Sequence, residues 1–399
     1  MRFFIIGVGL GSEALLTGDA RRALLEADVV FSTARLARGL STLRPDCIVC
    51  GIGELAERAR AARARTVAVL VSGDTGFFSA AKRLHAQLAA HGEVTLLCGV
   101  SSLQYFCAKL GTQYDDIHIC SVHGREGSLL GAVSYHKRVF ALTGGAQTAQ
   151  TVCRALTAAG LGGVFVAIGE NLGASDERIV TGTASMFADE PCGDLAVLLV
   201  EHDDAVDARE PVRDDMLTRG NVPMTKEEVR WVSAAKLAVR PHDTVWDVGA
   251  GTGAVTLELA RRAAQGTVYA IERDPEAVSL LCLNRAKLGG YNICPVEGAA
   301  PAALQELPAP NRVFIGGSGG QLREILSIVR EKNRAARVVI NAIALETLQE
   351  AMAALEELGF ADREVVQISA ARGRAVGKYT MMTANNPVFI ISGGGSDAT

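Results

Sequence analysis

The sequence predicts an α/β protein of two domains, the second of them Rossmann-like. Apolar stretches rich in Val, Ile and Leu recur with little polar alternation, as in strands buried on both faces of a sheet. Many end in a glycine-rich turn before a helical segment, and the 42 glycines exceed the usual share of about 7%. The chain has 399 residues, more than one ordinary domain.

The first domain is expected over residues 1–202, as a series of strand, loop and helix units. Its apolar strands and the turns that follow them are predicted at residues 2–9, 66–76, 93–102, 138–145, 162–173 and 194–202. The segment 15–30 is a helix that leads into a further short strand.

Residues 203–215 are polar and predict a linker. The second domain is expected over 216–391, with a flexible tail at 392–399. It opens with an amphipathic helix, for which Thr225 is the predicted N-cap and Glu228 stands three residues later. Segments 363–373 and 385–394 are expected to close a seven-stranded sheet as an antiparallel pair.

Composition excludes several classes of protein. Forty basic against 44 acidic residues give a net charge of −4, which disfavours a nucleic-acid substrate. No apolar run reaches the ~20 residues of a membrane span, so a cytoplasmic protein is expected. The nine cysteines are scattered, and Cys47 and Cys50 form a CxxC without the second pair of a zinc site. We therefore expect no metal.

The stretch VWDVGAGTGAVTLELA carries the more specific of two glycine loops. An apolar strand ends at Asp247, and Gly249, Gly251 and Gly253 form a tight turn before a helix. Backbone N–H groups there face a ligand's polar edge. Glu272 ends the next strand about 20 residues on, where a carboxylate suits two ribose hydroxyls. We favour S-adenosylmethionine over a nicotinamide cofactor or a structural turn, because the spacing is not GxGxxG.

The strand 312–317 ends in Gly316 and Gly317, which leave room for a bulky, flat substrate. Enzymes that methylate base amino groups carry an Asp/Asn-Pro-Pro-aromatic cluster at this point, and this sequence has none there. Asn386-Pro387 lies in a different strand and is interpreted as an ordinary turn.

The motifs NVPMTKEEVR, DTVWDVGAGTG, AIERDPEA and RVFIGGSGG together closely resemble the decarboxylating C15 methyltransferases of corrin biosynthesis, over about residues 210–390. The resemblance implies a class I methyltransferase fold. It implies that S-adenosylmethionine is held by Thr225, Gly249, Ala250, Gly251, Thr252, Gly253, Glu272 and Ala300. Many relatives carry Asp where this chain has Ala299, so backbone contacts to adenine are expected instead.

The motifs GVGLGSEALLT, SGDTGFFS, CGVSSLQ, VHGRE, LTGG and ENLGASDERI resemble the tetrapyrrole methylases that act at C5, over about residues 1–202. That fold has two α/β subdomains with a trough between them. The resemblance implies that a second S-adenosylmethionine contacts Gly73, Asp74, Gly76, Ser101, Ser102, Thr143 and Gly169. It places the macrocycle on Gly7, Gly9 and Gly11. Thr75 and Cys98 depart from the family's usual Pro residues.

A polycarboxylate substrate needs cations around it. The candidates are Arg35, Arg38, His123, Arg125 and Arg178 in the first domain and Arg219, Lys226 and Arg230 in the second. Arg125 is favoured because it belongs to the family motif. Asp74 and His123 are candidate general bases, and a loop cap is an equal interpretation of Asp74.

Together the resemblances imply a bifunctional enzyme of cobalamin biosynthesis that methylates a precorrin at C5 and C15 and decarboxylates a ring acetate. One S-adenosylmethionine per domain, no metal and no pyridoxal phosphate are expected. The expected partners are the precorrin and further copies of the chain in a homo-oligomer, without nucleic acid or membrane. Two alternatives stay open: a first domain that only binds tetrapyrrole, and a nucleic-acid methyltransferase.

Overall fold

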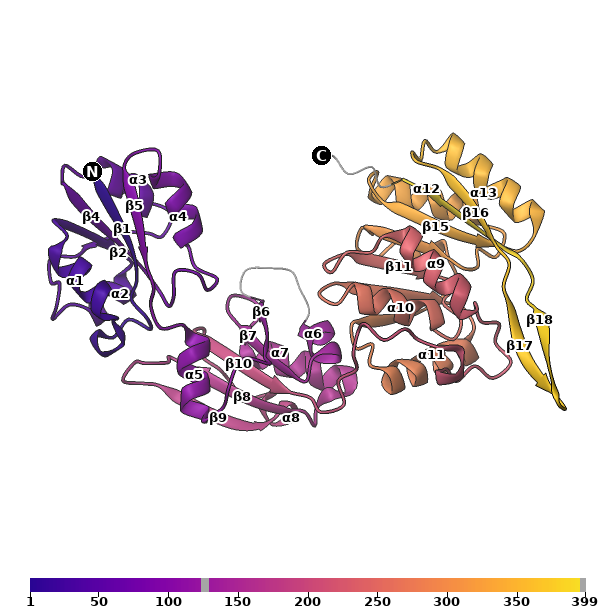
Figure 1. Cartoon of the computed structure of the whole chain (residues 1–399), viewed down its shortest axis with the longest axis horizontal. Coiled ribbons are helices and arrows are strands. Elements are labelled where there is room, and N and C mark those ends of the chain that lie inside the picture. The colour runs from indigo at the N-terminus through magenta and orange to yellow at the C-terminus, as the bar shows by residue number, and fades with distance from the viewer. Residues whose placement is uncertain (123–128, 395–399) are drawn as a thin grey trace. The chain divides into compact units, whose positions relative to one another are not determined.

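The computed structural model describes residues 1–122 and 129–394 (Figure 1). Its chain divides into two compact units, one of residues 1–125 and 138–200 and the other of residues 126–137 and 201–399. Helix α6 (Leu129–Tyr135) thus belongs to the second unit. The strands before and after it, β6 (His118–Ser121) and β7 (Arg138–Leu142), belong to the first.

Two five-stranded sheets form the described part of the first unit, in the orders β3-β2-β4-β1-β5 and β6-β7-β10-β8-β9. Their remaining strands are β1 (Arg2–Gly7), β2 (Val29–Ser32), β3 (Ile48–Val49), β4 (Thr66–Val71), β5 (Glu93–Leu97), β8 (Phe165–Glu170), β9 (Arg178–Thr183) and β10 (Ala196–Glu201). The helices are α1 (Gly18–Glu26), α2 (Ala34–Gly39), α3 (Leu55–Ala61), α4 (Ala81–Leu88), α5 (Ser102–Leu110), α7 (Ala149–Leu156) and α8 (Ala184–Phe187).

The central strand of the first sheet, β1, pairs in parallel with β4 on one side and β5 on the other. Every residue of β4 is buried, as its unbroken apolar run predicts. Parallel strands end at the same edge of a sheet. The turns that begin at Gly7, Gly73 and Gly99 therefore meet, and Gly9 and Gly73 exchange two backbone hydrogen bonds of 3.2 and 2.6 Å.

The second unit contains the expected seven-stranded sheet, in the order β13-β12-β11-β14-β15-β19-β16 over the residues that the structure describes. Its strands are β11 (Thr244–Val248), β12 (Thr267–Glu272), β13 (Ile293–Glu297), β14 (Arg312–Ile315), β15 (Arg337–Ala342), β16 (Glu364–Ile368) and β19 (Val388–Gly393). The pairs from β13 to β15 are parallel. The prediction of a closing antiparallel pair is confirmed, because β19 runs antiparallel to both β15 and β16.

Helices cover both faces of this sheet: α9 (Glu227–Leu237), α10 (Ala254–Arg262), α11 (Pro275–Leu288), α12 (Leu322–Lys332) and α13 (Leu345–Glu357). Alternate residues of each strand serve the two faces. On β11, Val245 packs with α9, α10 and α11, whereas Trp246 packs with α12 and α13. Both residues are fully buried. The seven-stranded sheet is thus anchored on both faces, which fixes the loops at its edge.

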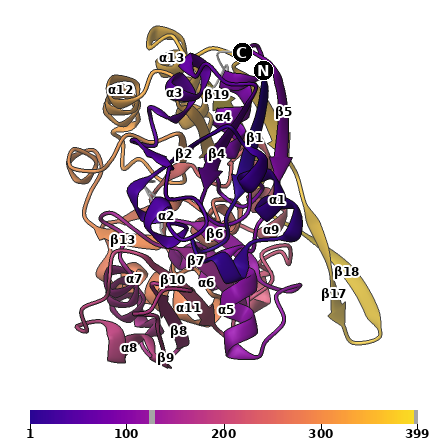
Figure 2. The same cartoon turned by 90° about the vertical axis from the view of Figure 1, so that its left-hand side faces the viewer.

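A feature that the sequence did not predict is a hairpin between β16 and β19. It consists of β17 (Ala371–Val376) and β18 (Tyr379–Ala384), which pair only with each other among the described strands. It projects away from the seven-stranded sheet in both views (Figures 1 and 2). No helix of the described residues is long and apolar enough to cross a membrane.

Candidate cofactor and substrate sites

The glycine loop of the second unit joins β11 to α10 and requires its glycines. Gly249, Gly251 and Gly253 have φ values of +76°, +55° and +79°, in the region that side chains disfavour. A Cβ on Gly249 would also lie 2.8 Å from the backbone N and O of Gly317. The loop therefore lies against the turn after β14, and both turns present bare backbone.

Glu272 lies at the end of β12, and its carboxylate is held beside this loop by backbone donors. Its Oε2 accepts a hydrogen bond of 2.9 Å from the N–H of Gly251. Its Oε1 accepts from the N–H groups of Arg273 and Asp274, at 2.8 and 3.0 Å. A carboxylate has about four lone-pair sites, so acceptor capacity is left for a ligand's hydroxyls.

A cavity of about 950 Å³ opens over these turns. This is at the upper end of the range for small-molecule sites. It brings together nine of the residues that the sequence singled out: Thr225, Gly249, Ala250, Gly251, Thr252, Glu272, Ala300, Gly316 and Gly317. Ala299 lines it as well. Gly253 does not line it and instead stands at the N-cap of α10.

Asp247, the single acidic residue of β11, also lines the cavity and is fully buried. Its Oδ2 accepts a hydrogen bond of 2.5 Å from the Thr256 hydroxyl, and its Oδ1 has no protein partner. The pKa of this carboxyl is raised to about 7: burial is the main cause, the charge of Glu272 also raises the pKa, and hydrogen bonds from Thr256 oppose the rise. The unpaired oxygen is thus a free acceptor beside the glycine loop.

Another part of the lining was missed by the sequence analysis. It comprises Asn341, Ile343, Ile368, Ala370, Asn385, Asn386 and Val388, all near the ends of β15, β16 and the hairpin. Asn341 accepts a hydrogen bond of 3.0 Å from the Ser233 hydroxyl, and its Nδ2 is buried without a partner. The interpretation of Asn386-Pro387 as an ordinary turn overlooked that Asn386 lines this cavity.

The expected N-cap at Thr225 was wrong by one residue, since α9 begins at Glu227 with Lys226 at its N-cap. The carbonyl oxygen of Thr225 instead accepts a hydrogen bond of 2.6 Å from Nη1 of Arg230. The buried guanidinium of Arg230 also binds Asp214, at 2.6 Å. Arg230 is therefore committed inside the protein and is not a free cation for a substrate, whereas Lys226 lines the cavity.

A second cavity, of about 300 Å³, lies within the first unit. Four of the residues expected to contact a methyl donor there line it: Gly73, Ser102, Thr143 and Gly169. Leu10 and Arg35 line it from the first glycine loop and from α2. Arg35 donates to the carbonyl of Leu10 at 3.2 Å and to the Ser72 hydroxyl at 2.7 Å.

The glycines of the first loop do not line this cavity and pack against neighbouring turns and α2. A Cβ on Gly7 would lie 2.8 Å from the Gly73 carbonyl oxygen and 2.9 Å from the Gly99 nitrogen. Gly9, with φ at +60°, pairs with Gly73. Gly11 has φ at +91° and contacts α2 near Arg35. These glycines thus set how closely the three turns approach one another.

Asp74, Gly76 and Ser101 do not line the cavity either. The Asp74 carboxylate accepts N–H bonds from Gly76 at 2.8 Å and from Gly99 at 3.1 Å, which joins two turns. This geometry favours the loop cap among the two interpretations of Asp74. Ser101 caps α5 and forms a capping box with Gln104.

The remaining cation candidates differ in availability. Arg178 forms ion pairs with Glu170, at 2.8 Å, and with Glu190. Arg38 and Arg219 are exposed. His123 and Arg125 lie outside the described residues. Among the described residues, no group of three or more His, Cys, Asp or Glu side chains is placed to hold a metal ion.

Sequence comparisons match each half of the chain to a family. Residues 2–188 match the tetrapyrrole (corrin/porphyrin) methylases, and residues 218–393 match the precorrin methyltransferase domain. A probable cobalt-precorrin-6B C(15)-methyltransferase (decarboxylating) of Pyrobaculum calidifontis is 43% identical, over 45% of this chain and 94% of that protein. A precorrin-6Y C(5,15)-methyltransferase [decarboxylating] of Sinorhizobium is 29% identical over 96% of this chain and 94% of that protein.

Among solved structures, one of a precorrin-6y C5,15-methyltransferase from Geobacter metallireducens is 36% identical. It covers 46% of this chain and 97% of that one, with a TM-score of 0.44. The second half matches the precorrin methyltransferase domain and has a seven-stranded sheet with a glycine loop and an acid on the next strand, so its class is that of the S-adenosylmethionine-dependent methyltransferases. The sequence matches are more specific: the chain belongs to the precorrin methyltransferases.

Proposed function

We propose that this chain is a bifunctional enzyme that converts precorrin-6Y to precorrin-8X, with one methylation at C5 in the first unit and one at C15, with loss of the ring C acetate carboxyl, in the second. The observation that carries the proposal is the presence of two separate cavities, one in each unit, each lined by at least one glycine turn at the end of a parallel strand. The match to the Sinorhizobium precorrin-6Y C(5,15)-methyltransferase [decarboxylating] spans 96% of this chain.

In the second unit, the geometry fits an adenosine ligand at the glycine loop. The bare backbone of Gly249 and Gly251 permits close approach, and Glu272 is held with spare acceptor capacity for ribose hydroxyls. The cavity volume, about 950 Å³, is at the upper end of the range for small-molecule sites, and we infer that a macrocycle edge is accommodated against Gly316 and Gly317.

In the first unit, the proposed methyl-donor contacts are Gly73, Ser102, Thr143 and Gly169, which share one cavity. We assign to Asp74, Gly76 and Ser101 the role of holding those turns, and to Gly7, Gly9 and Gly11 the spacing between them. Arg35 is the cation that the described lining offers to a substrate carboxylate.

S-adenosylmethionine supplies a methyl group on an already activated sulfonium, and the protein's task is alignment and the exclusion of water. Backbone turns and buried walls meet that requirement without a nucleophile. For the decarboxylation, the conjugated imines of the macrocycle serve as the electron sink.

The test separates the two sites in the full chain. Ser102→Tyr fills the first cavity, and Ala108→Tyr puts the same side chain on an exposed position of α5 as its control. Glu272→Ala removes the acid of the second site. Each variant is assayed with methyl-labelled S-adenosylmethionine and a precorrin-6Y acceptor, and binding of S-adenosylhomocysteine is measured by calorimetry.

We expect two binding sites per chain in the wild type and in Ala108→Tyr. Ser102→Tyr should retain one site and yield product methylated at C15 alone, without its acetate carboxyl. Glu272→Ala should retain one site and methylate C5 alone. A single site that survives Ser102→Tyr, with no C5 product in any variant, would make the first unit a binding module only. Activity on RNA but not on the precorrin would overturn the proposal. Homo-oligomerisation is part of it and is checked by light scattering.

A further inference from the structure

The hairpin β17–β18 is continuous with the lining of the large cavity. Ala370 precedes β17, and Asn385 and Asn386 follow β18, and all three line the cavity. The N–H of Asn385 donates to the carbonyl of Ala370 at 2.9 Å, which closes the root of the hairpin. The orientation of the hairpin therefore decides where this part of the cavity lining stands.

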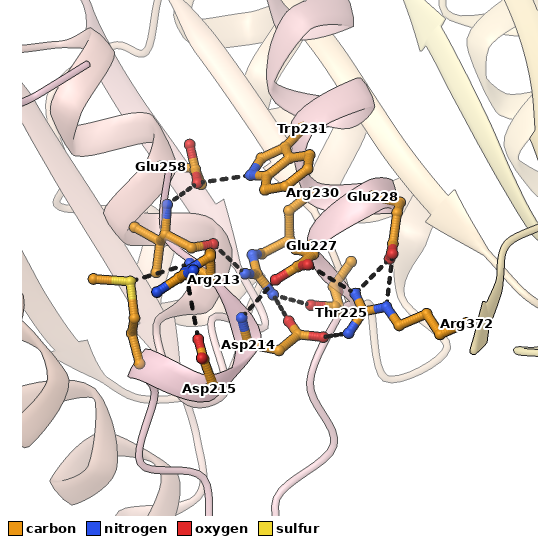
Figure 3. A network of polar contacts seen from close by, with 12 residues as sticks. Arg213, Asp214, Asp215, Thr225, Glu227, Glu228, Arg230, Trp231, Glu258 and Arg372 are labelled. Carbon is orange, nitrogen blue, oxygen red and sulfur yellow. Dashed lines mark hydrogen bonds and ion pairs between the residues drawn. The ribbon is translucent and has the colours of Figure 1, made fainter. Parts of the chain in front are cut away.

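Another part of the lining, residues 222–226, leads directly into α9. It contains Thr225, the proposed cofactor contact. Four charged side chains at or near this junction belong to the polar network drawn in Figure 3. They are Asp214, Glu227, Glu228 and Arg230.

Arg372, the second residue of β17, joins the hairpin to this network. Its Nε and Nη2 bind the two carboxylate oxygens of Glu228, both at 2.7 Å, in a bidentate pair. Nη2 of Arg372 also lies 3.3 Å from Oε1 of Glu227, and Nη1 of Arg372 lies 3.1 Å from Oδ2 of Asp214. A lysine cannot reproduce this fork of donors.

Asp214 carries the connection further. Its Oδ1 accepts from Nη1 of Arg230 at 2.6 Å, and the same nitrogen binds the carbonyl of Thr225 at 2.6 Å. Nη2 of Arg230 binds the carbonyl of Val212, also at 2.6 Å. A continuous chain of contacts thus runs from the hairpin through Arg372, Asp214 and Arg230 to Thr225 (Figure 3).

The charges make Arg372 the sensitive member of this chain. Three carboxylates, of Asp214, Glu227 and Glu228, surround it, and Arg230 pairs with only the first of them. Without Arg372, carboxylates crowded at the start of α9 repel one another, and nothing in the network holds the hairpin root to that helix. The side chain of Arg372 is 39% exposed, so its pairs contribute little to global stability.

We propose that Arg372 is a positioning residue for methyl transfer: it fixes the hairpin root, which lines one part of the cavity, relative to the segment that carries Thr225. This inference rests on the function proposed for the second unit. A displacement of about 1 Å between reacting groups costs on the order of 100-fold in rate. The ion pairs of Arg372 therefore have a large kinetic effect although they contribute little to global stability.

The experiment compares Arg372→Gln, Arg372→Lys and, as the matched control, Arg374→Gln on the same strand, where Arg374 is exposed. Steady-state kinetics give kcat and both KM values at the C15 site. Hydrogen exchange is followed in residues 222–226 and 379–386, and S-adenosylhomocysteine binding is measured by calorimetry. We expect Arg372→Gln to lower kcat/KM for the acceptor by at least tenfold, with Tm within a few degrees of the wild type.

Arg372→Lys should lie between the two, and Arg374→Gln should match the wild type. In Arg372→Gln, hydrogen exchange should rise in both segments together, because the ion pairs of Arg372 hold both. The affinity for S-adenosylhomocysteine should fall several-fold. Wild-type kinetics, or wild-type exchange and affinity, in Arg372→Gln would overturn the proposal. If Tm falls steeply, Glu228→Gln repeats the measurements on the bidentate partner. A wild type that does not methylate the precorrin would contradict the proposed function. Hydrogen exchange and S-adenosylhomocysteine affinity would then still test whether Arg372 positions the two segments.

Discussion

The backbone N–H of Gly251 donates a hydrogen bond of 2.9 Å to Oε2 of Glu272, across two adjacent parallel strands of the seven-stranded sheet. This contact orients the Glu272 carboxylate beside the glycine loop before any ligand arrives. Since ordering a side chain costs conformational entropy, a carboxylate that is already oriented binds hydroxyls with a smaller entropic cost.

Glu272→Gln should therefore weaken S-adenosylhomocysteine binding at the second site by at least tenfold. An amide replaces one of two oxygens that now accept backbone N–H bonds, and one acceptor becomes a donor. The control is Glu297→Gln, because Glu297 is paired with Glu272 in register on β13 and is exposed. Calorimetry checks both variants. Equal affinities would remove Glu272 from the proposed site.

The close approach of the turns in the first unit predicts an effect of Gly7→Ala. The added Cβ meets the Gly73 oxygen and the Gly99 nitrogen below 3.0 Å, and both atoms belong to backbone. We expect a loss of roughly 1–3 kcal/mol in the free energy of unfolding, as for other overpacked sites, and weaker binding in the first cavity. Gly18→Ala, where no atom lies within 4 Å, is the control. Denaturant titrations that show no difference between them would contradict the packing role.

The raised pKa of Asp247 predicts that the free energy of unfolding of the ligand-free protein depends on pH. Its pKa is raised to about 7 in the folded state from an ordinary 3.8, so the folded protein binds a proton that the unfolded chain releases. The stability that this proton gives is fully present below pH 3.8 and is lost as the pH rises toward 7 and above. Subtracting the stability curve of Asp247→Asn from that of the wild type should show a decline between about pH 4 and 7. A flat difference would contradict it.

From the polar contacts of helix α6 with the rest of the second unit we predict the effect of Tyr135→Phe. The buried Tyr135 hydroxyl lies 3.2 Å from Oδ1 of Asn292, whose Nδ2 binds the carbonyls of Ala260 and Ala263. Removal of the hydroxyl leaves that oxygen buried without its donor, at a cost of about 1–3 kcal/mol. The exposed Tyr114→Phe should be neutral. Thermal unfolding of the full chain checks the pair, and equal Tm values would contradict the prediction.

The sequence predicted the parts of the fold that local patterns encode. Unbroken apolar runs marked the buried strands, and the spacing of Gly249, Gly251, Gly253 and Glu272 marked the loop over the large cavity. These signals are short in sequence because a strand, a turn and the next strand are consecutive. The closing antiparallel pair was also predicted, from two apolar segments near the C-terminal end.

Features that depend on distant contacts were not predicted. The hairpin β17–β18 has no core face, so its sequence lacks the apolar alternation that marks a half-buried strand. Asn341 lines the cavity because β15 lies beside β19, and no spacing reveals this. Arg230 resembled a substrate cation until its burial against Asp214 was known.

The membership of α6 in the second unit bears on how the chain folds during synthesis. Tyr135 and Asn292 are 157 positions apart, so the helix leaves the ribosome long before its partner exists. At about 5–20 residues per second, this interval is roughly 8–30 s. Over that time the apolar face of α6 is a natural client for chaperones. A single cut of the gene near codon 202 also cannot yield two fragments that each hold a complete unit.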